Sequence, residues 1–307
     1  MVYPLELIIA ADAVHETAMN PLRTLLAPNA GLLIPGAGNA LTARLVESAG
    51  FPVVYLTGAG ISNWWLGAPD VGLTSVAEVA AHIAACREAV SIPIVADGDT
   101  GFGNAVNLVR TVKLFERAGA DAIQIEDQVY PKRCGHFDGK AVVPAAEMVQ
   151  KIKAAVDTRS HADFLVIART DARAVEGFDA ALDRAAAYRE AGADVLFIEA
   201  PASEAELRDI PRRLPGPHLC NIVHGGKTPM LPREALAAMG YAGILYANAA
   251  LQAAMLAMQR TLQHLQHTGS LEGAQDLLIG FAERQTAVDH ERWSALEQRY
   301  ATPPSRA

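Results

Sequence analysis

Short apolar runs recur along the chain, and each is followed by a polar or glycine-rich stretch and then by an alanine-rich pattern typical of a helix. Eight such runs begin at Gly31, Phe51, Ile92, Asp121, Phe164, Asp194, His218 and Ala242. The runs are continuous rather than alternating, which is typical of parallel strands buried on both faces. Three helical patterns end in a glycine just before or at the next run, in ESAG, ERAGA and REAGA, as expected for a helix C-cap.

Eight βα units predict an α/β fold of the (β/α)8 type, a TIM-type barrel. A doubly wound open sheet is the alternative, but it would need fewer strands or a second domain. No linker rich in Gly, Pro or Ser divides the chain. We therefore predict a single domain over residues 1–307, with the barrel at roughly 20–265.

Both ends of the chain lie outside the repeated pattern. Residues 1–30 are predicted to form a few turns of helix before the first strand. The segment 250–300 is strongly helical, and 266–307 form a C-terminal helical extension. The extension carries an apolar stripe with nothing obvious left to cover once the barrel is closed. It either caps its own barrel or packs on a neighbouring subunit.

Composition and charge narrow the function classes. The 307 residues are 51% hydrophobic, and the formal net charge of −8 argues against nucleic acid or an anionic membrane as a partner. No apolar run approaches the ~18–20 residues of a membrane span, and no signal peptide is expected. Three cysteines without CxxC spacing suggest free thiols in a reducing cytoplasm. Cys86 and Cys220 lie in apolar patterns and are predicted to be buried, whereas Cys134 lies in a polar loop.

Polar residues gather where the predicted strands end, and in a (β/α)8 barrel these ends carry the active site. The positions are Tyr55, Thr57, Gly58, Ala59, Gly60, Asp97, Asp99, Glu126, Asp127, Arg169, Asp171, Glu199, Asn221, His224 and Asn248. Several carboxylates on one rim repel one another unless a cation lies among them, and oxygen ligands suit Mg²⁺ or Mn²⁺. Asp97 and Asp99 flank a glycine, and with Glu126 on the adjacent strand they predict a metal site.

Other chemistries lack their motifs. No lysine ends a predicted strand, which disfavours a Schiff-base aldolase. Neither a GxGxxG after a strand nor a Walker loop supports the use of a dinucleotide or ATP. The HGGK stretch at His224–Lys227 follows the seventh strand, where many barrels bind phosphate, and is a candidate anion site.

Seven motifs carry a resemblance to a known family. They are YLTGAG, GAPDVGLTS, IVADGDTGFGN, IQIEDQVYPKRCGH, ARTDAR, FIEAP and N-x4-G-x-TP. Over roughly residues 20–265 the chain resembles the isocitrate lyase / phosphoenolpyruvate mutase superfamily. The KRCGH element at Lys132–His136 is the most specific, and it is similar to that of the lyases acting on methylisocitrate, 2,3-dimethylmalate, other 2-alkylmalates and oxaloacetate.

The resemblance implies a carbon–carbon lyase that depends on Mg²⁺, with Mn²⁺ as the alternative metal. Its reaction would cleave the C2–C3 bond of a 2-hydroxy-dicarboxylate, such as a 2-alkylmalate, to pyruvate or a related oxo acid and a carboxylate. The metal ligands, direct or through water, would be Asp97, Asp99, Asp70 and Glu126. The substrate would contact Thr57, Gly58, Ala59, Lys132, Gly135, Arg169, Glu199 and Asn221.

The family roles of the catalytic residues follow the same resemblance. Tyr55 would contact the C2 hydroxyl and accept its proton. Cys134 would be the general acid that protonates the departing carbanion, with Lys132, Arg133 and His136 lowering the pKa of its thiol toward neutrality. Outside this motif, Cys134 would be interpreted as a structural thiol with cationic neighbours.

Departures from the family pattern limit the range of substrates that the resemblance allows. After KRCGH the chain continues with Phe137-Asp138-Gly139 where methylisocitrate lyases typically have Arg-Pro-Asn, so a tricarboxylate is disfavoured. His224 stands where many relatives carry Glu, and it either changes the charge near Arg169 or is a surface loop residue. Trp64 and Trp65 either wall the pocket or pack under the loop.

Four alternatives to an alkylmalate lyase remain: oxaloacetate hydrolysis or decarboxylation, (2-methyl)isocitrate cleavage, phosphonate chemistry, and a non-catalytic acid binder. The resemblance also implies a homotetramer, a dimer of dimers with C-terminal helices exchanged between subunits.

Overall fold

Eight parallel strands close on one another in sequence order. The computed structural model describes residues 21–133, 135 and 139–302. The ring is closed by pairing of β1 with β8, where Leu32 lies opposite Gly243. The strands are β1 Leu32–Ala37, β2 Val54–Leu56, β3 Ile94–Asp97, β4 Ala122–Glu126, β5 Leu165–Thr170, β6 Val195–Ile198, β7 His218–Asn221 and β8 Gly243–Tyr246. The predicted TIM-type barrel is confirmed, and each strand lies in one of the eight apolar runs.

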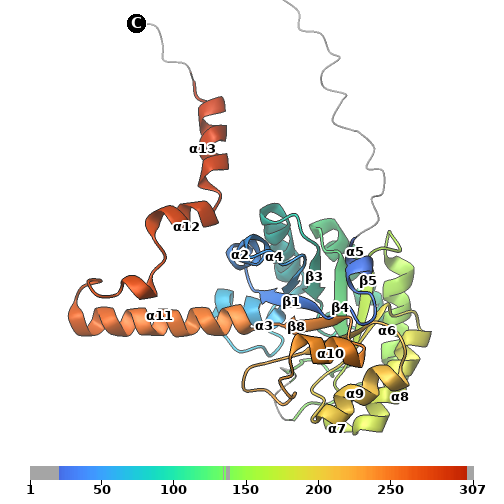
Figure 1. Ribbon diagram of the computed structural model, residues 1–307. Coiled ribbons are helices and arrows are strands. Elements are labelled where there is room, and N and C mark those ends of the chain that lie inside the picture. Colours follow the sequence, from blue (N-terminus) through green and yellow to red (C-terminus); the bar gives the residue numbers. More distant parts are fainter. Residues whose placement is uncertain (1–20, 134, 136–138, 303–307) are drawn as a thin grey trace, which may run out of the picture.

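Helices surround the barrel and follow its strands (Figure 1). They are α1 Pro21–Leu25, α2 Ala40–Ser48, α3 Gly58–Ile61, the π-helical turn η3 Ser62–Leu66, α4 Val76–Ala89, α5 Ala105–Ala118, α6 Ala145–Thr158, α7 Ala172–Val175, α8 Phe178–Glu190, α9 Glu204–Arg213, α10 Arg233–Met239 and α11 Ala249–Thr268, followed by the 3-10 turn η4 Gln275–Leu277, α12 Phe281–Ala287 and α13 His290–Arg299. Several begin at side-chain caps, such as the reciprocal bonds of Ser75 and Glu78 at α4.

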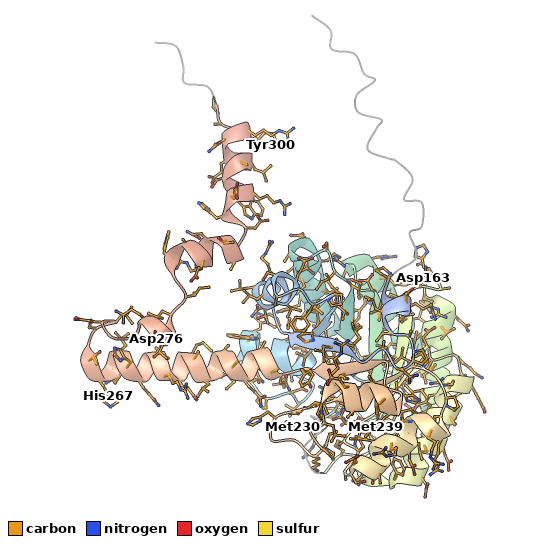
Figure 2. All side chains as sticks on the ribbon, in the orientation of Figure 1. Asp163, Met230, Met239, His267, Asp276 and Tyr300 are labelled. Atoms are coloured by element: carbon orange, nitrogen blue, oxygen red, sulfur yellow. The ribbon has the colours of Figure 1, made fainter. Side chains whose placement is uncertain are left out.

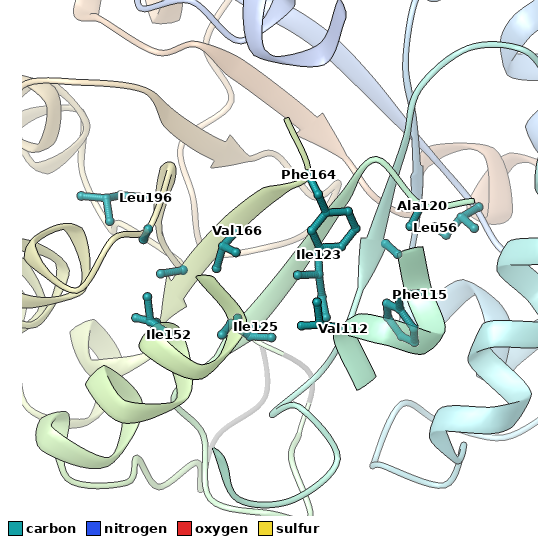
Figure 3. Packing of buried hydrophobic residues seen from close by; sticks show 14 of the residues in the cluster. Leu56, Val112, Phe115, Ala120, Ile123, Ile125, Ile152, Phe164, Val166 and Leu196 are labelled. Carbon is teal, nitrogen blue, oxygen red and sulfur yellow. The ribbon is translucent and has the colours of Figure 1, made fainter. Parts of the chain in front are cut away.

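Two apolar layers hold the barrel. On β5, Leu165 and Ile167 belong to the cluster inside the barrel, whereas Val166 and Ala168 belong to the layer between the strands and the helices. Figure 3 shows part of this outer layer, with Phe115 of α5 and Ile152 of α6 against the strands. Because successive side chains of a strand point to opposite faces, a strand buried on both sides must be apolar throughout. This explains the continuous apolar runs.

The C-terminal helices form an arm. Helix α11 projects from the barrel, and α12 and α13 follow at its far end (Figures 1 and 2). The arm returns to the barrel at α2, where α12 contacts it and Arg44 lies 3.3 Å from Asp289. The helical pattern predicted through residues 270–300 is only partly correct: the chain leaves the helix after Gly269, and Gly280 precedes α12.

The two described cysteines are buried free thiols, as predicted. Cys86 lies on α4 and Cys220 on β7. Burial raises the pKa of the Cys86 thiol to about 12 and that of Cys220 further, so neither is a reactive thiolate at neutral pH. Within the ranges described, no helix is long and apolar enough to cross a membrane.

Candidate active site

The inward-facing positions of the strands change from apolar to polar toward their carboxyl ends. On β5, Leu165 and Ile167 are followed two residues later by Arg169, and on β6, Val195 and Phe197 are followed by Glu199. The period of two therefore carries the last inward side chain of each strand to the same end of the barrel.

These side chains converge on a cavity of about 40 Å³. Its predicted site residues are Tyr55, Ala59, Asp70, Asp97, Lys132, Gly135, Arg169, Glu199 and Asn221. Its other lining residues are Arg133, Val223, Leu245, Ala247 and Asn248. So small a volume holds about one water molecule, because buried charged side chains fill the end of the barrel.

An acidic cluster surrounds the ammonium group of Lys132. Lys132 Nζ lies 2.5 Å from Asp70 Oδ1 and 2.9 Å from Asp99 Oδ1. The side chains of Lys132, Asp99 and Asp70 are 4%, 6% and 11% exposed. Asp97 lies beside this group and accepts hydrogen bonds from Gly58 N at 3.1 Å and Asp99 N at 3.2 Å. Three predicted metal ligands thus share one buried region with a lysine.

Negative charge exceeds positive charge in this cluster. Burial raises the pKa of Asp99 to about 6, and the carboxylates of Asp97 and Asp70 add to the effect, which Lys132 only partly offsets. Burial also raises the pKa of Glu126 well above its usual range. Burial alone would lower the pKa of Lys132, but Asp99 and Asp70 outweigh it, so the lysine is held charged.

The predicted metal ligands fit a hard divalent cation in their chemistry. Glu126 Oε1 is buried without a hydrogen-bond donor among the described residues. Oxygen donors and excess negative charge are what Mg²⁺ requires. In the described part of the chain, no three Asp, Glu, His or Cys side chains are grouped so that they could hold a metal ion, and the Lys132 ammonium contacts both Asp70 and Asp99. A metal ion would compete with this ammonium for the same oxygens.

Arg169 is a second buried cation that lines the cavity. Its Nε lies 2.9 Å from Asp171 Oδ2, and its Nη2 lies 3.0 Å from Asp171 Oδ1. Glu126 Oε2 and Glu199 Oε2 lie farther from Nε, at 3.4 Å and 3.8 Å. Asp171 is therefore the main partner that orients the guanidinium. These bonds use the Nε–Nη2 edge, and Nη1 makes no hydrogen bond among the residues that the structure describes.

Tyr55 is bonded to a residue that the sequence analysis did not single out. Its hydroxyl donates to Gln124 Oε1 at 2.9 Å, and Gln124 Nε2 lies 3.4 Å from Asp97 Oδ1. Burial and the charge of Asp97 raise the pKa of the Tyr55 phenol well above its usual range. The phenol is therefore a hydrogen-bond donor at neutral pH. Gln124 could have been found from its position two residues before Glu126 on the same strand.

The remaining predicted residues either do not line the cavity or lie outside the described part of the chain. Thr57 is the N-cap of α3, and its hydroxyl accepts from Gly60 N. Cys134 and His136 lie outside the described residues.

Neither Trp64 nor Trp65 lines the cavity, and Trp65 is exposed with its ring edge-on to His82. His224 is exposed in the loop after β7, at a neighbouring apolar groove that shares Val223 and Asn248 with the cavity.

Comparison with known proteins places the chain in a family. The family model described as "Phosphoenolpyruvate phosphomutase" matches residues 22–266. The protein belongs to the phosphoenolpyruvate mutase / isocitrate lyase superfamily. It is 46% identical over 281 residues to 2,3-dimethylmalate lyase of Eubacterium barkeri, covering 92% of this chain and 97% of that protein. It is 42% identical over 283 residues to 2-methylisocitrate lyase of Aeropyrum pernix, covering 91% of each.

Solved structures agree in fold and give two more activities by name. The 2,3-dimethylmalate lyase structure superposes with a TM-score of 0.84 at 32% identity, covering 91% of this chain and 93% of that chain. The structure of oxaloacetate acetylhydrolase with 3,3-difluorooxalacetate superposes with a TM-score of 0.85 at 31% sequence identity, covering 93% of this chain and 98% of that chain. The structure of phosphonopyruvate hydrolase with oxalate and Mg²⁺ superposes with a TM-score of 0.81 at 33% sequence identity, covering 91% of this chain and 97% of that chain. The relatives named as lyases support a carbon–carbon lyase.

Proposed function

We propose that the protein cleaves the C2–C3 bond of a 2-alkylmalate, such as 2,3-dimethylmalate, to pyruvate or a related oxo acid and a carboxylate. The observation that carries the proposal is the cavity at the carboxyl ends of the strands, which is lined both by carboxylates of the acidic cluster and by Arg169. A dicarboxylate whose C1 end binds near a metal and whose other end binds a guanidinium matches this combination of charges. The likeness to 2,3-dimethylmalate lyase supports the alkylmalate.

The acidic cluster is the proposed Mg²⁺ site. Asp97, Asp99, Asp70 and Glu126 would hold the ion directly or through water. Bound there, Mg²⁺ would polarise the C2 oxygen and offset the charge of the C1 carboxylate. Lys132 lies among the same oxygens and keeps the cluster neutralised in part. The Mg²⁺ in the phosphonopyruvate hydrolase structure supports this choice of metal over Mn²⁺.

Substrate carboxylates would be held from two directions. Arg169 offers its Nη1, since Asp171 occupies the opposite edge of the guanidinium. Asn221 and Glu199 lie beside it, with Asn221 Nδ2 3.5 Å from Glu199 Oε1, and Asn221 Oδ1 is a buried atom without a donor among the described residues. The turn at Thr57–Ala59 lies beside Asp97 and would bind the other carboxylate through the amide of Ala59, which lines the cavity, since Thr57 N donates to Ala37 O and Gly58 N to Asp97 Oδ2.

Proton transfer in this proposal involves the acidic cluster and Cys134. As the C2–C3 bond breaks, the C2 hydroxyl gives its proton to a carboxylate of the acidic cluster, where burial raises the pKa of Asp99 and Glu126, and the bonding electrons pass to C3, which must then be protonated. The Tyr55 phenol is held protonated, so we assign it to orient the C2 oxygen by turning its single O–H donor from Gln124 to the substrate, rather than to accept the proton. We assign the protonation of C3 to the Cys134 thiol, with His136 in the same motif.

The test is an assay of oxo-acid release with Mg²⁺ and a panel of malate, citramalate, 2,3-dimethylmalate, methylisocitrate, isocitrate and oxaloacetate. We expect turnover of one alkylmalate, collapsing in Cys134→Ser and reduced but measurable in Tyr55→Phe. Equal loss in both variants would contradict this division of roles between the thiol and the phenol. No turnover of any alkylmalate by the wild-type protein would overturn the proposal.

Oxaloacetate hydrolysis is the second candidate, favoured by the superposition with oxaloacetate acetylhydrolase. The products distinguish the reactions, because hydrolysis gives oxalate and acetate, decarboxylation gives pyruvate and CO₂, and the lyase gives an oxo acid and a carboxylate. Cleavage of methylisocitrate, favoured by the relative from Aeropyrum pernix, would release succinate instead of an unbranched or alkylated monocarboxylate.

We also propose that the C-terminal arm packs on a second copy of the chain in a homo-oligomer. Large apolar side chains on the arm are exposed, among them Leu262 at 65%, Phe281 at 70% and Trp293 at 56%. Exposed apolar surface of this extent is typical of an interface. Removing the part of the arm after Gly269, which carries Phe281 and Trp293, should lower the molecular mass seen by light scattering to that of a smaller assembly, and an unchanged subunit number would contradict the proposal.

A further inference from the structure

Lys140 makes a buried ion pair next to the proposed active site. Its Nζ lies 2.7 Å from Asp171 Oδ1, and the two side chains are 2% and 0% exposed. The same ammonium group donates a hydrogen bond to the carbonyl oxygen of Gly135. A lysine is costly to bury, and such a charge is found in protein interiors when it is paired and hydrogen-bonded. Lys140 does not line the cavity, so it does not meet a ligand there.

Asp171 is shared between Lys140 and Arg169. Its Oδ1 accepts from Lys140 Nζ and from Arg169 Nη2, while its Oδ2 accepts from Arg169 Nε. Burial alone would raise the pKa of Asp171, but Arg169 and Lys140 outweigh it and lower it to about 2. The carboxylate is therefore ionised, and it orients the Arg169 guanidinium through two bonds.

Gly135 closes a ring of contacts with the same groups. A Cβ at this position would lie 2.3 Å from Arg169 Nη2 and 2.8 Å from Glu199 Cδ, so the backbone approaches the guanidinium as closely as only glycine allows. From Gly135 the contacts run through its carbonyl to Lys140, on to Asp171 and Arg169, and back to the Gly135 backbone. Loss of Lys140 would open this ring at two bonds.

The backbone under Asp171 is held independently of Lys140. Asp171 N donates to Asp127 Oδ1 at 2.9 Å, and Thr170 Oγ1 donates to Asp127 Oδ2 at 2.7 Å. Removal of the Lys140 ammonium should therefore shift the side chains of Asp171 and Arg169 and the Gly135 backbone, while strand β5 stays in place.

We propose that Lys140 is a positioning residue, which fixes the Arg169 guanidinium and the Gly135 backbone relative to each other so that Arg169 Nη1 meets a carboxylate in the cavity. The inference rests on the proposed function only in assigning a carboxylate ligand to Arg169. If Lys140 served only to balance the buried charge of Asp171, its loss would lower stability without a specific effect on ligand binding.

The test compares Lys140→Met with Lys140→Arg and with Lys153→Met, an exposed lysine on α6 as the matched control. Oxalate binding in the presence of Mg²⁺, measured by calorimetry, reads the position of Arg169 without needing turnover. We expect Lys140→Met to lose about 10- to 100-fold in oxalate affinity, as is typical when the partner of a ligand-binding side chain is removed. Lys140→Arg should recover part of this loss, and Lys153→Met should match the wild-type protein.

A double variant shows whether Lys140 acts through Arg169. If it does, adding Lys140→Met to Arg169→Met should cost little further affinity, whereas independent effects would add. Wild-type affinity in Lys140→Met would overturn the inference, as would additive effects, failure of Lys140→Arg to recover any binding, or a wild-type protein that binds no oxalate. Oxalate binding that depends on Lys140 in a protein without lyase turnover would keep this inference and reject the proposed function.

Discussion

Replacing Lys132 by methionine tests whether the acidic residues of the cavity form one electrostatic unit. The ammonium lies 2.5 Å and 2.9 Å from the carboxylates of Asp70 and Asp99, and all three side chains are at most 11% exposed. An exposed ion pair would be worth about 0–1 kcal/mol, but a buried pair that loses one partner costs about 3–5 kcal/mol because the other charge is left uncompensated. We therefore expect Lys132→Met to lose about 3–5 kcal/mol of unfolding free energy at neutral pH in the presence of a chelator.

The pH and metal dependence of this loss identify its cause. Without the lysine, the pKa of Asp99 should rise above the value of about 6 that it has in the intact protein. The folded variant then binds this proton more tightly than the folded wild-type protein, so its stability deficit is present at neutral pH and shrinks as the pH falls toward 6, below which Asp99 is protonated in both proteins. Mg²⁺ should reduce the deficit as well, because it replaces the missing positive charge.

The assay is urea unfolding followed by circular dichroism, at neutral pH and near pH 5, with chelator or with Mg²⁺. Lys153→Met is the control, since that lysine is exposed on α6. A Lys132→Met protein within about 0.5 kcal/mol of the control under chelation would refute the reasoning, because a change of that size is typical of a surface substitution. A deficit that neither Mg²⁺ nor acid relieves would show that packing, rather than charge, is lost.

Three further predictions follow from the same geometry. Gly135→Ala should lower turnover about 100-fold, because its Cβ would displace Arg169; steady-state kinetics measure this, and an unchanged rate would contradict the close approach. Asp127→Asn should cost about 3 kcal/mol in urea unfolding, because Asp127 accepts from Tyr188 and from the β5 end; a loss below about 1 kcal/mol would contradict it. Asp99→Asn should gain stability relative to the wild-type protein as the pH rises from 4 through 6. The raised pKa of Asp99 stabilises the folded state below about 4, and that contribution is lost above 6, so a pH-independent difference would refute the shift.

The positions of the strands could be predicted from the sequence because burial on both faces leaves a continuous apolar run. The ends of the same runs gave candidate site positions: Asp97 ends β3, Glu126 ends β4 and Arg169 lies next to the end of β5. A parallel barrel brings those ends together regardless of the details of packing. The fold and the family therefore followed from local pattern and motif, and so did the strand-end positions of these three residues.

The pairing within the site was decided only by the tertiary structure. The family resemblance implied that Arg169 and Glu199 both contact the substrate, whereas in the structure Asp171 lies closer to Arg169 than Glu199 does and accepts from two of its donors. The family resemblance implied a proton-accepting role for Tyr55, but burial beside Asp97 keeps the phenol protonated. Differences of an ångström in distance decide which side chains pair, and the loss of solvent decides which groups stay protonated. Neither quantity can be computed from the amino-acid sequence.

The direction of the C-terminal arm is another feature that the sequence does not determine. The helical pattern predicted helices beyond residue 250, and they are present, but glycines at 269, 273 and 280 divide them. Where α11 points depends on its packing at the barrel rim, which is a tertiary property. The sequence by itself determined which segments are helices, strands and chemically active loops, because those follow from periodicity and residue type. The folded chain decided which charges meet, since that requires segments more than thirty residues apart, such as Lys140 and Asp171, to be brought into contact.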